Sequence, residues 1–144
     1  MKAQWMLLAA LAMTLGAALP ARAAPDKEGL YAGYRGISIP MSGYKLAFVE
    51  KGDRIDVLVT FEATMKDNKK EKVTATFLQN VVVVNVQKPA KLEDLGVVEL
   101  LLNPTETQYA ALSSYSGELS IAQRAEGDVS MVPMEMASLR KLLR

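Results

Sequence analysis

The sequence contains no cysteine and no histidine among its 144 residues. Without cysteine there can be no disulfides and no thiol nucleophiles, and without either residue there can be no zinc site of the Cys and His kind. Mechanisms that require an imidazole base are also excluded. We therefore expect a protein that is not an enzyme and that binds no cofactor and no metal.

An excess of charge of one sign is also lacking. The 17 Lys and Arg residues nearly balance the 16 Asp and Glu residues, which leaves a net charge of +1. No basic block supplies the electrostatic field on which nucleic-acid binding depends, so nucleic acid is not an expected partner. Apolar residues make up 50% of the chain and charged residues 23%, a balance typical of one folded domain.

An uncharged and mostly apolar stretch near the N-terminus, 5–19, is too short to be a membrane anchor. As a helix it would measure about 22 Å, whereas the hydrocarbon core of a bilayer is about 30 Å thick. Lys2 before the stretch and the small-residue site ending at Ala23 are typical of a cleaved secretory signal. We therefore predict a signal peptide at 1–23, a flexible lead-in at 24–33, and a periplasmic mature chain without a stable membrane span.

Beyond the lead-in, apolar and polar residues alternate in short stretches, which indicates strands with one buried face. The alternation is clearest at 54–61, where one face carries Ile55, Val57, Val59 and Phe61. The unbroken valine run at 81–84 needs cover on both faces, so we expect it to lie centrally in the sheet. Further strands are predicted at 36–41, 73–77, 97–102 and 119–121.

A lysine-rich segment, 66–72, separates two of these predicted strands. Its four positive charges stand against two negative ones. A polar hairpin loop is the simpler interpretation, and a contact patch for an acidic partner is the alternative.

One helix is predicted between two of the later strands. Asn103 can cap its N-terminus, with Pro104 at the first helical position and Glu106 three residues after the cap. Gly117 suits a left-handed stop, which places the helix near 104–115. The segment carries apolar residues at helical spacing: Tyr109, Leu112 and Tyr115.

The C-terminal tail, 131–144, could also be helical from residue 134 onward, because its last turn would then carry cations that favour the helix dipole. Together the elements predict a mainly β fold. We expect a small barrel-like or β-clip-related sheet domain at 34–130, with one short helix inserted near 104–115 and a possible C-terminal helix.

Five segments in order resemble one protein family. The runs YRGISIP (34–40) and EKGDRIDVLVTF (50–61) look like the RAVSIPV and PGDRVDVLVTF patterns of the RcpC/CpaB family of Flp pilus assembly proteins. Three later segments are similar to the family's LLQNVRVLAV strand, its strand followed by TPEQAE, and its GKLSLALR strand. They are FLQNVVVV (77–84), the stretch 97–112, and GELSIAQR (117–124).

This resemblance covers 34–128 and implies a role in the tight-adherence secretion system that builds type IVb Flp pili. Family members are exported, β-rich and non-enzymatic, usually with a membrane helix and a β-clip domain ahead of the matched region. Only about ten residues separate the predicted cleavage site from residue 34, which favours a stand-alone soluble subunit that matches the RcpC-like domain only. The resemblance implies other pilus or secretion proteins as partners, with pilin, secretin and a second copy of this chain as candidates.

A candidate partner-binding surface lies near the start of the mature chain. The aromatic rings of Tyr31, Tyr34 and Tyr44 could line a groove for a sugar or a peptide, or pack over the end of a barrel. Ile37 and Ile39 are candidates for an edge strand that a partner extends by strand addition. The alternative function is therefore a periplasmic binding module for cell-wall glycan or peptide.

Two chemical signals in the tail have simpler interpretations. Ser138 and Lys141 show the Ser-x-x-Lys spacing of some hydrolases, but we interpret them as part of an amphipathic tail. The three tail methionines could suggest a soft-metal site. Without His or Cys, an adaptable apolar contact surface is the favoured interpretation of Met131, Met134 and Met136.

Overall fold

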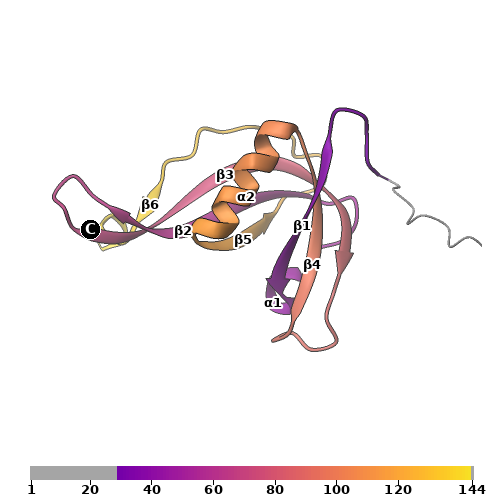
Figure 1. Ribbon diagram of the computed structural model, residues 1–144, viewed down its shortest axis with the longest axis horizontal. Coiled ribbons are helices and arrows are strands. Elements are labelled where there is room, and N and C mark those ends of the chain that lie inside the picture. The colour runs from indigo at the N-terminus through magenta and orange to yellow at the C-terminus, as the bar shows by residue number, and fades with distance from the viewer. Residues whose placement is uncertain (1–28, 144) are drawn as a thin grey trace, which may run out of the picture.

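An antiparallel sheet of six strands organises residues 29–143, the part of the chain that the computed structural model describes (Figure 1). Five strands follow the order β1-β4-β3-β2-β5, and β6 pairs with β3 beside this path. The elements in chain order are β1 (Arg35–Ser42), α1 (Gly43–Leu46), β2 (Arg54–Thr64), β3 (Lys70–Gln87), β4 (Leu95–Leu102), α2 (Pro104–Ser116), β5 (Glu118–Gln123), β6 (Ala137–Ser138) and α3 (Leu139–Leu142).

The prediction of a mainly β fold with a helix between two strands is confirmed. The sheet is not closed into a barrel, because β1 and β5 lie at its opposite edges. The strands predicted from alternation all appear, and the two predicted at 73–77 and 81–84 belong to one long strand, β3. Among the described residues, no helix is long and apolar enough to cross a membrane.

The long strand β3 holds the sheet together by pairing with different neighbours along its length. From Lys70 to Val82 it pairs with β2, and from Val82 to Gln87 it pairs with β4. The valine run therefore lies centrally, as predicted, and Val81, Val83 and Val84 are buried. Toward their shared turn, β2 and β3 extend as a two-stranded ribbon away from the other long strands (Figure 1).

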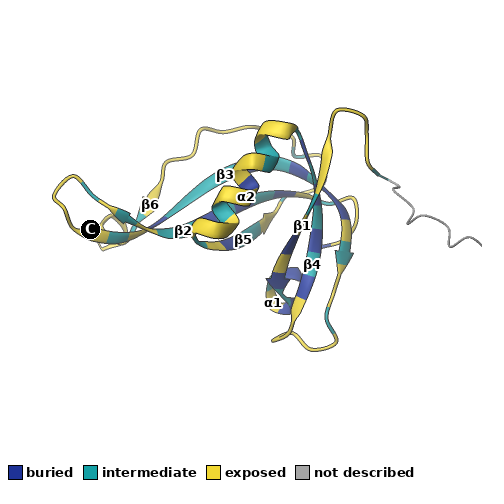
Figure 2. Ribbon diagram, in the orientation of Figure 1, coloured by how far each residue is buried: buried dark blue, intermediate teal, exposed yellow. Residues whose placement is uncertain are grey.

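The core is built by the strands β1 to β5 and by α1, and α2 contributes one buried residue to it (Figure 2). Alternate residues of β4 are buried, and Val98, Leu100 and Leu102 have no exposed surface. On the helix the buried residue is Ala110. Because a methyl side chain is small, Ala110 allows α2 to lie close to the sheet.

The N-terminus of α2 forms as predicted, but its C-terminus does not. Asn103 and Glu106 each accept a hydrogen bond from the other's backbone N–H at 2.8 Å, which completes a capping box. Gly117 is extended, with φ −166°, and is not a left-handed stop. A Cβ there would lie 2.3 Å from the Thr60 carbonyl oxygen, so this position needs glycine because β2 passes so close.

The possible helix at 134–144 forms only as the four residues of α3, and the tail before β6 is not helical. The path of the tail follows from contacts with β3, where a side chain forms hydrogen bonds with the backbone of the tail. The Gln79 side chain donates to the Val132 carbonyl at 2.8 Å and accepts from the Val132 N–H at 3.1 Å. The predicted signal peptide and residues 24–28 of the lead-in lie outside the described residues.

Candidate binding site

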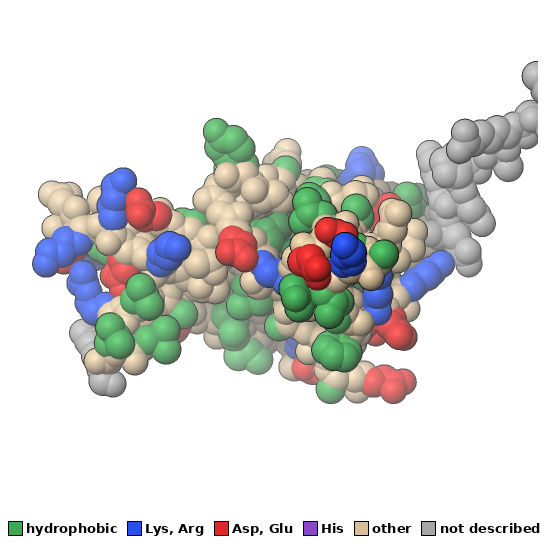
Figure 3. All heavy atoms as spheres, turned by 90° about the horizontal axis from the view of Figure 1, so that it is seen from below, with side chains coloured by type: hydrophobic (Ala, Val, Ile, Leu, Met, Phe, Trp, Pro, Cys, Tyr) green, Lys and Arg blue, Asp and Glu red, His purple; other side chains and the backbone are tan. Residues whose placement is uncertain are grey.

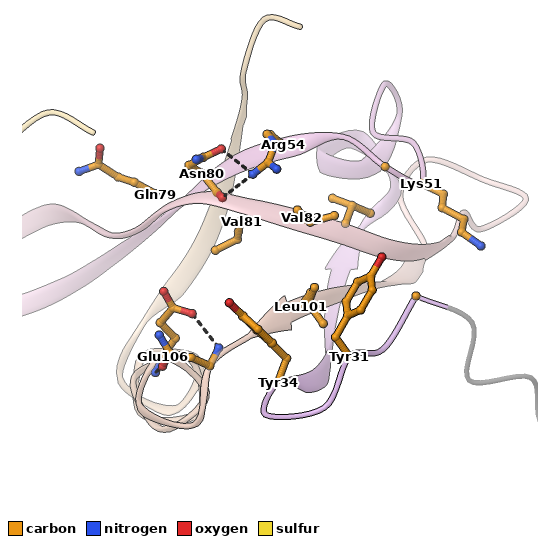
Figure 4. Close-up of a pocket in the computed structure, with 14 residues that line it drawn as sticks. Tyr31, Tyr34, Lys51, Arg54, Gln79, Asn80, Val81, Val82, Leu101 and Glu106 are labelled. Carbon is orange, nitrogen blue, oxygen red and sulfur yellow. Dashed lines mark hydrogen bonds between the residues drawn. The ribbon is translucent and has the colours of Figure 1, made fainter. Parts of the chain in front are cut away.

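Two tyrosines from the turn before β1 face the middle of the sheet across a pocket (Figure 4). A hydrogen bond of 3.0 Å from the Tyr34 N–H to the Tyr31 carbonyl closes this turn. Gly33 within the turn has φ +89°, a backbone conformation that favours glycine. Both rings project toward β3 and border a pocket of about 660 Å³. The turn thus presents two aromatic surfaces to one space.

The wall opposite the tyrosines is built around Asn80 in β3. Asn80 has φ +57°, which asparagine tolerates better than most residues, and the β2–β3 pairing shifts register beside it. Nη1 of Arg54 donates to the Asn80 carbonyl at 3.3 Å and to its Oδ1 at 3.0 Å. The Asn80 N–H donates to Oδ1 of Asp56 at 2.9 Å. These contacts fix an amide and a guanidinium at the pocket.

The rest of the pocket is apolar in its middle and polar at its ends. Val81, Val82 and Leu101 line the middle. Glu106 lines one end, where its carboxylate is held by the Asn103 N–H at the start of α2 (Figure 4). Two aromatic rings, a fixed guanidinium and a fixed amide around an apolar floor suit a sugar ring or a short peptide, whose apolar faces and polar groups both need contacts.

The predicted surface residues do not form one surface. Tyr31 and Tyr34 meet in the pocket, whereas Tyr44 lies in α1, beyond the opposite end of β1, and is 65% exposed. Ile37 and Ile39 lie on β1, which is an edge strand of the sheet. Ile39 is only 2% exposed, and Ile37 packs against the core. A partner added at this edge would therefore contact backbone and Tyr34 more than these isoleucines.

The outer face of α2 is apolar but uncovered among the described residues. Tyr109, Leu112 and Tyr115, the residues at helical spacing, are all exposed, and Tyr115 is 93% exposed. The opposite side of the helix packs on the sheet through Ala110. We call the three exposed residues the α2 stripe. It is a surface on which another protein could rest.

An ion-pair cluster behind the Asn80 wall anchors the start of the tail. The Arg124 side chain, 7% exposed, donates to Asp56 at 2.7 Å and to Asp128 at 3.2 Å. It also bonds the Ser130 carbonyl. Hydrogen bonds from the Ser130 hydroxyl and N–H, together with Arg124, lower the pKa of Asp128 from 3.8 to about 2. The same two carboxylates raise the pKa of Arg124.

Sequence reasoning found the two pocket tyrosines but missed Arg54, Asn80 and Glu106. Glu106 was assigned only to helix capping, and Arg54 only to a strand. A usable signal was Asn80 itself, because asparagine inside a valine-rich strand indicates a bulge or a left-handed residue. Pocket residues from the lead-in, β3 and α2 are far apart in sequence, so their meeting depends on the sheet order.

Within residues 29–143, no group of three His, Cys, Asp or Glu side chains is placed to hold a metal ion. No family model matches the chain, and neither a curated protein nor a solved structure matches it. The resemblance to the RcpC/CpaB family therefore stays a prediction from the sequence motifs.

Proposed function

We propose that this chain is an exported, non-enzymatic component of the Flp pilus assembly apparatus and acts as a scaffold or adaptor. One observation carries the proposal: the five segments that resemble the RcpC/CpaB family follow the family's order along most of the sheet. They fall on β1, β2, β3, β4 with α2, and β5. A resemblance that spans these consecutive elements covers a whole folding unit, whereas isolated strand motifs would cover single strands only.

The surface of the protein supports an adaptor role. The α2 stripe offers a row of apolar residues to a partner that has a complementary groove. The outer edge of β1 is a second contact, because β1 pairs only with β4 among the described strands. Pro40 lacks an N–H and so limits how many hydrogen bonds an added strand could make there.

Deletion and complementation in the source organism test this role. Deleting the gene should abolish surface Flp pili, and the wild-type gene should restore them. A double variant of the α2 stripe, Leu112→Ser with Tyr115→Ser, should fail to restore them although the protein is still produced. The matched control is Asn85→Ser, an exposed change on β3, which should restore pili fully.

A photo-crosslinking residue at position 112 then identifies the partner directly. We expect crosslinks to another protein of the apparatus at position 112 and none at position 85. A deletion strain that still carries normal pili would contradict the proposal, whatever the crosslinks show.

A second candidate function, a binding module for cell-wall glycan or peptide, is favoured by the tyrosine pocket. Peptidoglycan fragments carry sugar rings and carboxylates, which match the rings of Tyr31 and Tyr34 and the guanidinium of Arg54. Isothermal titration with soluble fragments should give saturable binding that is lost in Tyr31→Ala with Tyr34→Ala. Binding should persist in Tyr44→Ala, which removes a ring about as exposed as that of Tyr31 but outside the pocket. Equal loss in both variants would count against the pocket.

A further inference from the structure

The far end of the β2–β3 ribbon, together with α3, forms a protruding tip. Here β2 and β3 have passed beyond β5 and β4, and the short strand β6 is the remaining neighbour, paired at Val73 and Thr74. Arg140 at the start of α3 bonds Asp67 in the turn and Glu71 in β3. We call residues 62–72 and 136–143 the hairpin tip. It lies at the opposite end of the molecule from the segment that precedes β1 (Figure 1).

The hairpin tip exposes leucines at its end. Leu139, Leu142 and Leu143 are 52%, 75% and 85% exposed. Leu139 and Leu142 border a shallow hollow of about 190 Å³ beside Thr60, Lys72 and Thr74. Single exposed apolar residues are normal on protein surfaces, but a cluster of them marks an interaction site.

Cations outnumber carboxylates around these leucines. The tip carries Lys66, Lys69, Lys70, Lys72, Arg140 and Lys141 together with Glu62, Asp67 and Glu71. Glu135, just before the tip, pairs with Lys141 at 2.7 Å. Lys70 pairs with Glu62 at 3.1 Å, and Arg140 pairs with Asp67 at 3.1 Å. Figure 3 shows basic side chains around this end of the molecule, with hydrophobic side chains beside them.

Two of the lysines have their charge available to a partner, whereas Lys72, after Lys45, helps to lower the pKa of Glu118. No ion pair involves Lys66, Lys69 or Lys72 in the part of the chain from residue 29 to residue 143. Lys66 and Lys69 lie in the turn itself and are exposed, and Lys72 borders the leucine hollow. Positive charge therefore surrounds the apolar cluster.

We propose that the hairpin tip docks on an anionic phospholipid surface. Its leucines enter the boundary between headgroups and acyl chains, while the lysine ammonium groups contact lipid phosphates. Long lysine stems allow the charge to stay at the headgroups while the apolar groups go deeper. The docking is peripheral and reversible.

Composition and shape favour a membrane over an acidic protein as the occupant. Protein interfaces are enriched in aromatic residues and depleted of lysine, whereas the tip has five lysines and no aromatic residue. The leucines lie in or next to α3, at the protruding end of the ribbon (Figure 1), and two of them border only a shallow hollow. A planar bilayer can accept such a convex, basic and apolar end without a matching groove.

Fluorescence from single labelled sites tests the proposal in the full chain. Because the sequence has no cysteine, Leu142→Cys and Tyr115→Cys each give one site for an environment-sensitive dye. With vesicles of equal parts phosphatidylcholine and phosphatidylglycerol, the dye at 142 should shift to the blue, and the dye at 115 should not. The shift should be absent with phosphatidylcholine alone and should be reversed by 1 M salt, where the screening length is about 3 Å.

Paired lysine variants test the electrostatic part. In the Leu142→Cys background, Lys66→Gln with Lys69→Gln should weaken vesicle affinity at least about tenfold, since each lysine near an anionic surface contributes about fivefold. The matched control is Lys88→Gln with Lys91→Gln, which removes the same charge at the β3–β4 connection and should change affinity less than about twofold. The N-terminal apolar run is present in both proteins, so its effect cancels in the comparison.

Three results would overturn membrane docking. The first is no shift at position 142 with anionic vesicles. The second is an equal shift with phosphatidylcholine alone that neither salt nor the lysine changes affect. The third is tight binding of soluble polyglutamate without a vesicle response, which would assign the tip to an acidic protein. None of these results bears on pilus assembly, which is tested at the α2 stripe.

Discussion

The centre of the sheet and the C-terminal segment use apolar residues in opposite ways. In the centre, Leu100 and Leu102 have no exposed surface, whereas in 129–143 every large apolar side chain is exposed. Polar contacts hold the segment instead, through the Gln79 side chain and the ion pairs of Arg124 and Arg140. Such contacts each add little stability, so we expect the segment to open while the sheet stays folded.

The largest expected effect tests the buried side of this comparison. Leu100→Ala removes a fully buried side chain from the middle of β4. The cavity and the lost apolar burial should lower the free energy of unfolding by about 2–5 kcal/mol. Urea denaturation measures this value.

The matched control is Leu142→Ala, the same change on an exposed residue of α3. Its cost should stay within about 0.5 kcal/mol. Similar losses in the two variants would show that the segment is packed as firmly as the sheet, and the contrast between the regions would fail.

Substitutions at two glycines, one in each region, should differ by a smaller amount in their effect on the free energy of unfolding. Gly117→Ala places a Cβ against the Thr60 carbonyl oxygen in the packed region, which should cost about 1–3 kcal/mol because β2 or α2 must shift. Gly127 precedes the tail, has φ +79° and has no atom within 4 Å of the place where a Cβ would lie. Gly127→Asn should therefore stay within about 0.5 kcal/mol, since asparagine tolerates that conformation.

Urea denaturation of both variants gives the comparison. A Gly117→Ala protein as stable as the wild type would mean that β2 does not approach this position closely.

The sequence predicted what local chemistry controls. The period of two at 54–61 placed β2, because one face of that strand is buried. Asn103 and Glu106 placed the start of α2, since capping depends only on residues three apart.

Features that depend on distant partners were missed. Helical spacing located the α2 stripe but could not tell that the smaller Ala110 faces the sheet. Gly117 is required by Thr60, a residue of another strand. The path of the tail depends on the hydrogen bond between Gln79 and Val132, which are 53 positions apart. Tyr34 and Asn80 meet in the pocket only because β4 lies between β1 and β3.

The smallest expected effect concerns the anchor between the two regions. The folded state lowers the pKa of Asp128 from 3.8 to about 2, chiefly through the hydrogen bonds from Ser130. A lowered pKa means that the anchor contributes fully above pH 3.8 and is lost as the pH falls through about 2. NMR titration of the Asp128 carboxyl carbon should show this midpoint, and the Ser130 amide signal should move with it.

Ser130→Ala separates the anchor from the rest of the fold. It removes the hydroxyl hydrogen bond to Asp128 but leaves the backbone one at 3.0 Å, so the pKa of Asp128 should rise part of the way toward 3.8. Amide signals of β4 should not change across this range, because the sheet depends on apolar burial and not on this carboxylate. If the β4 signals moved together with Ser130, the tail and the sheet would be one cooperative unit, and the difference between the two regions would disappear.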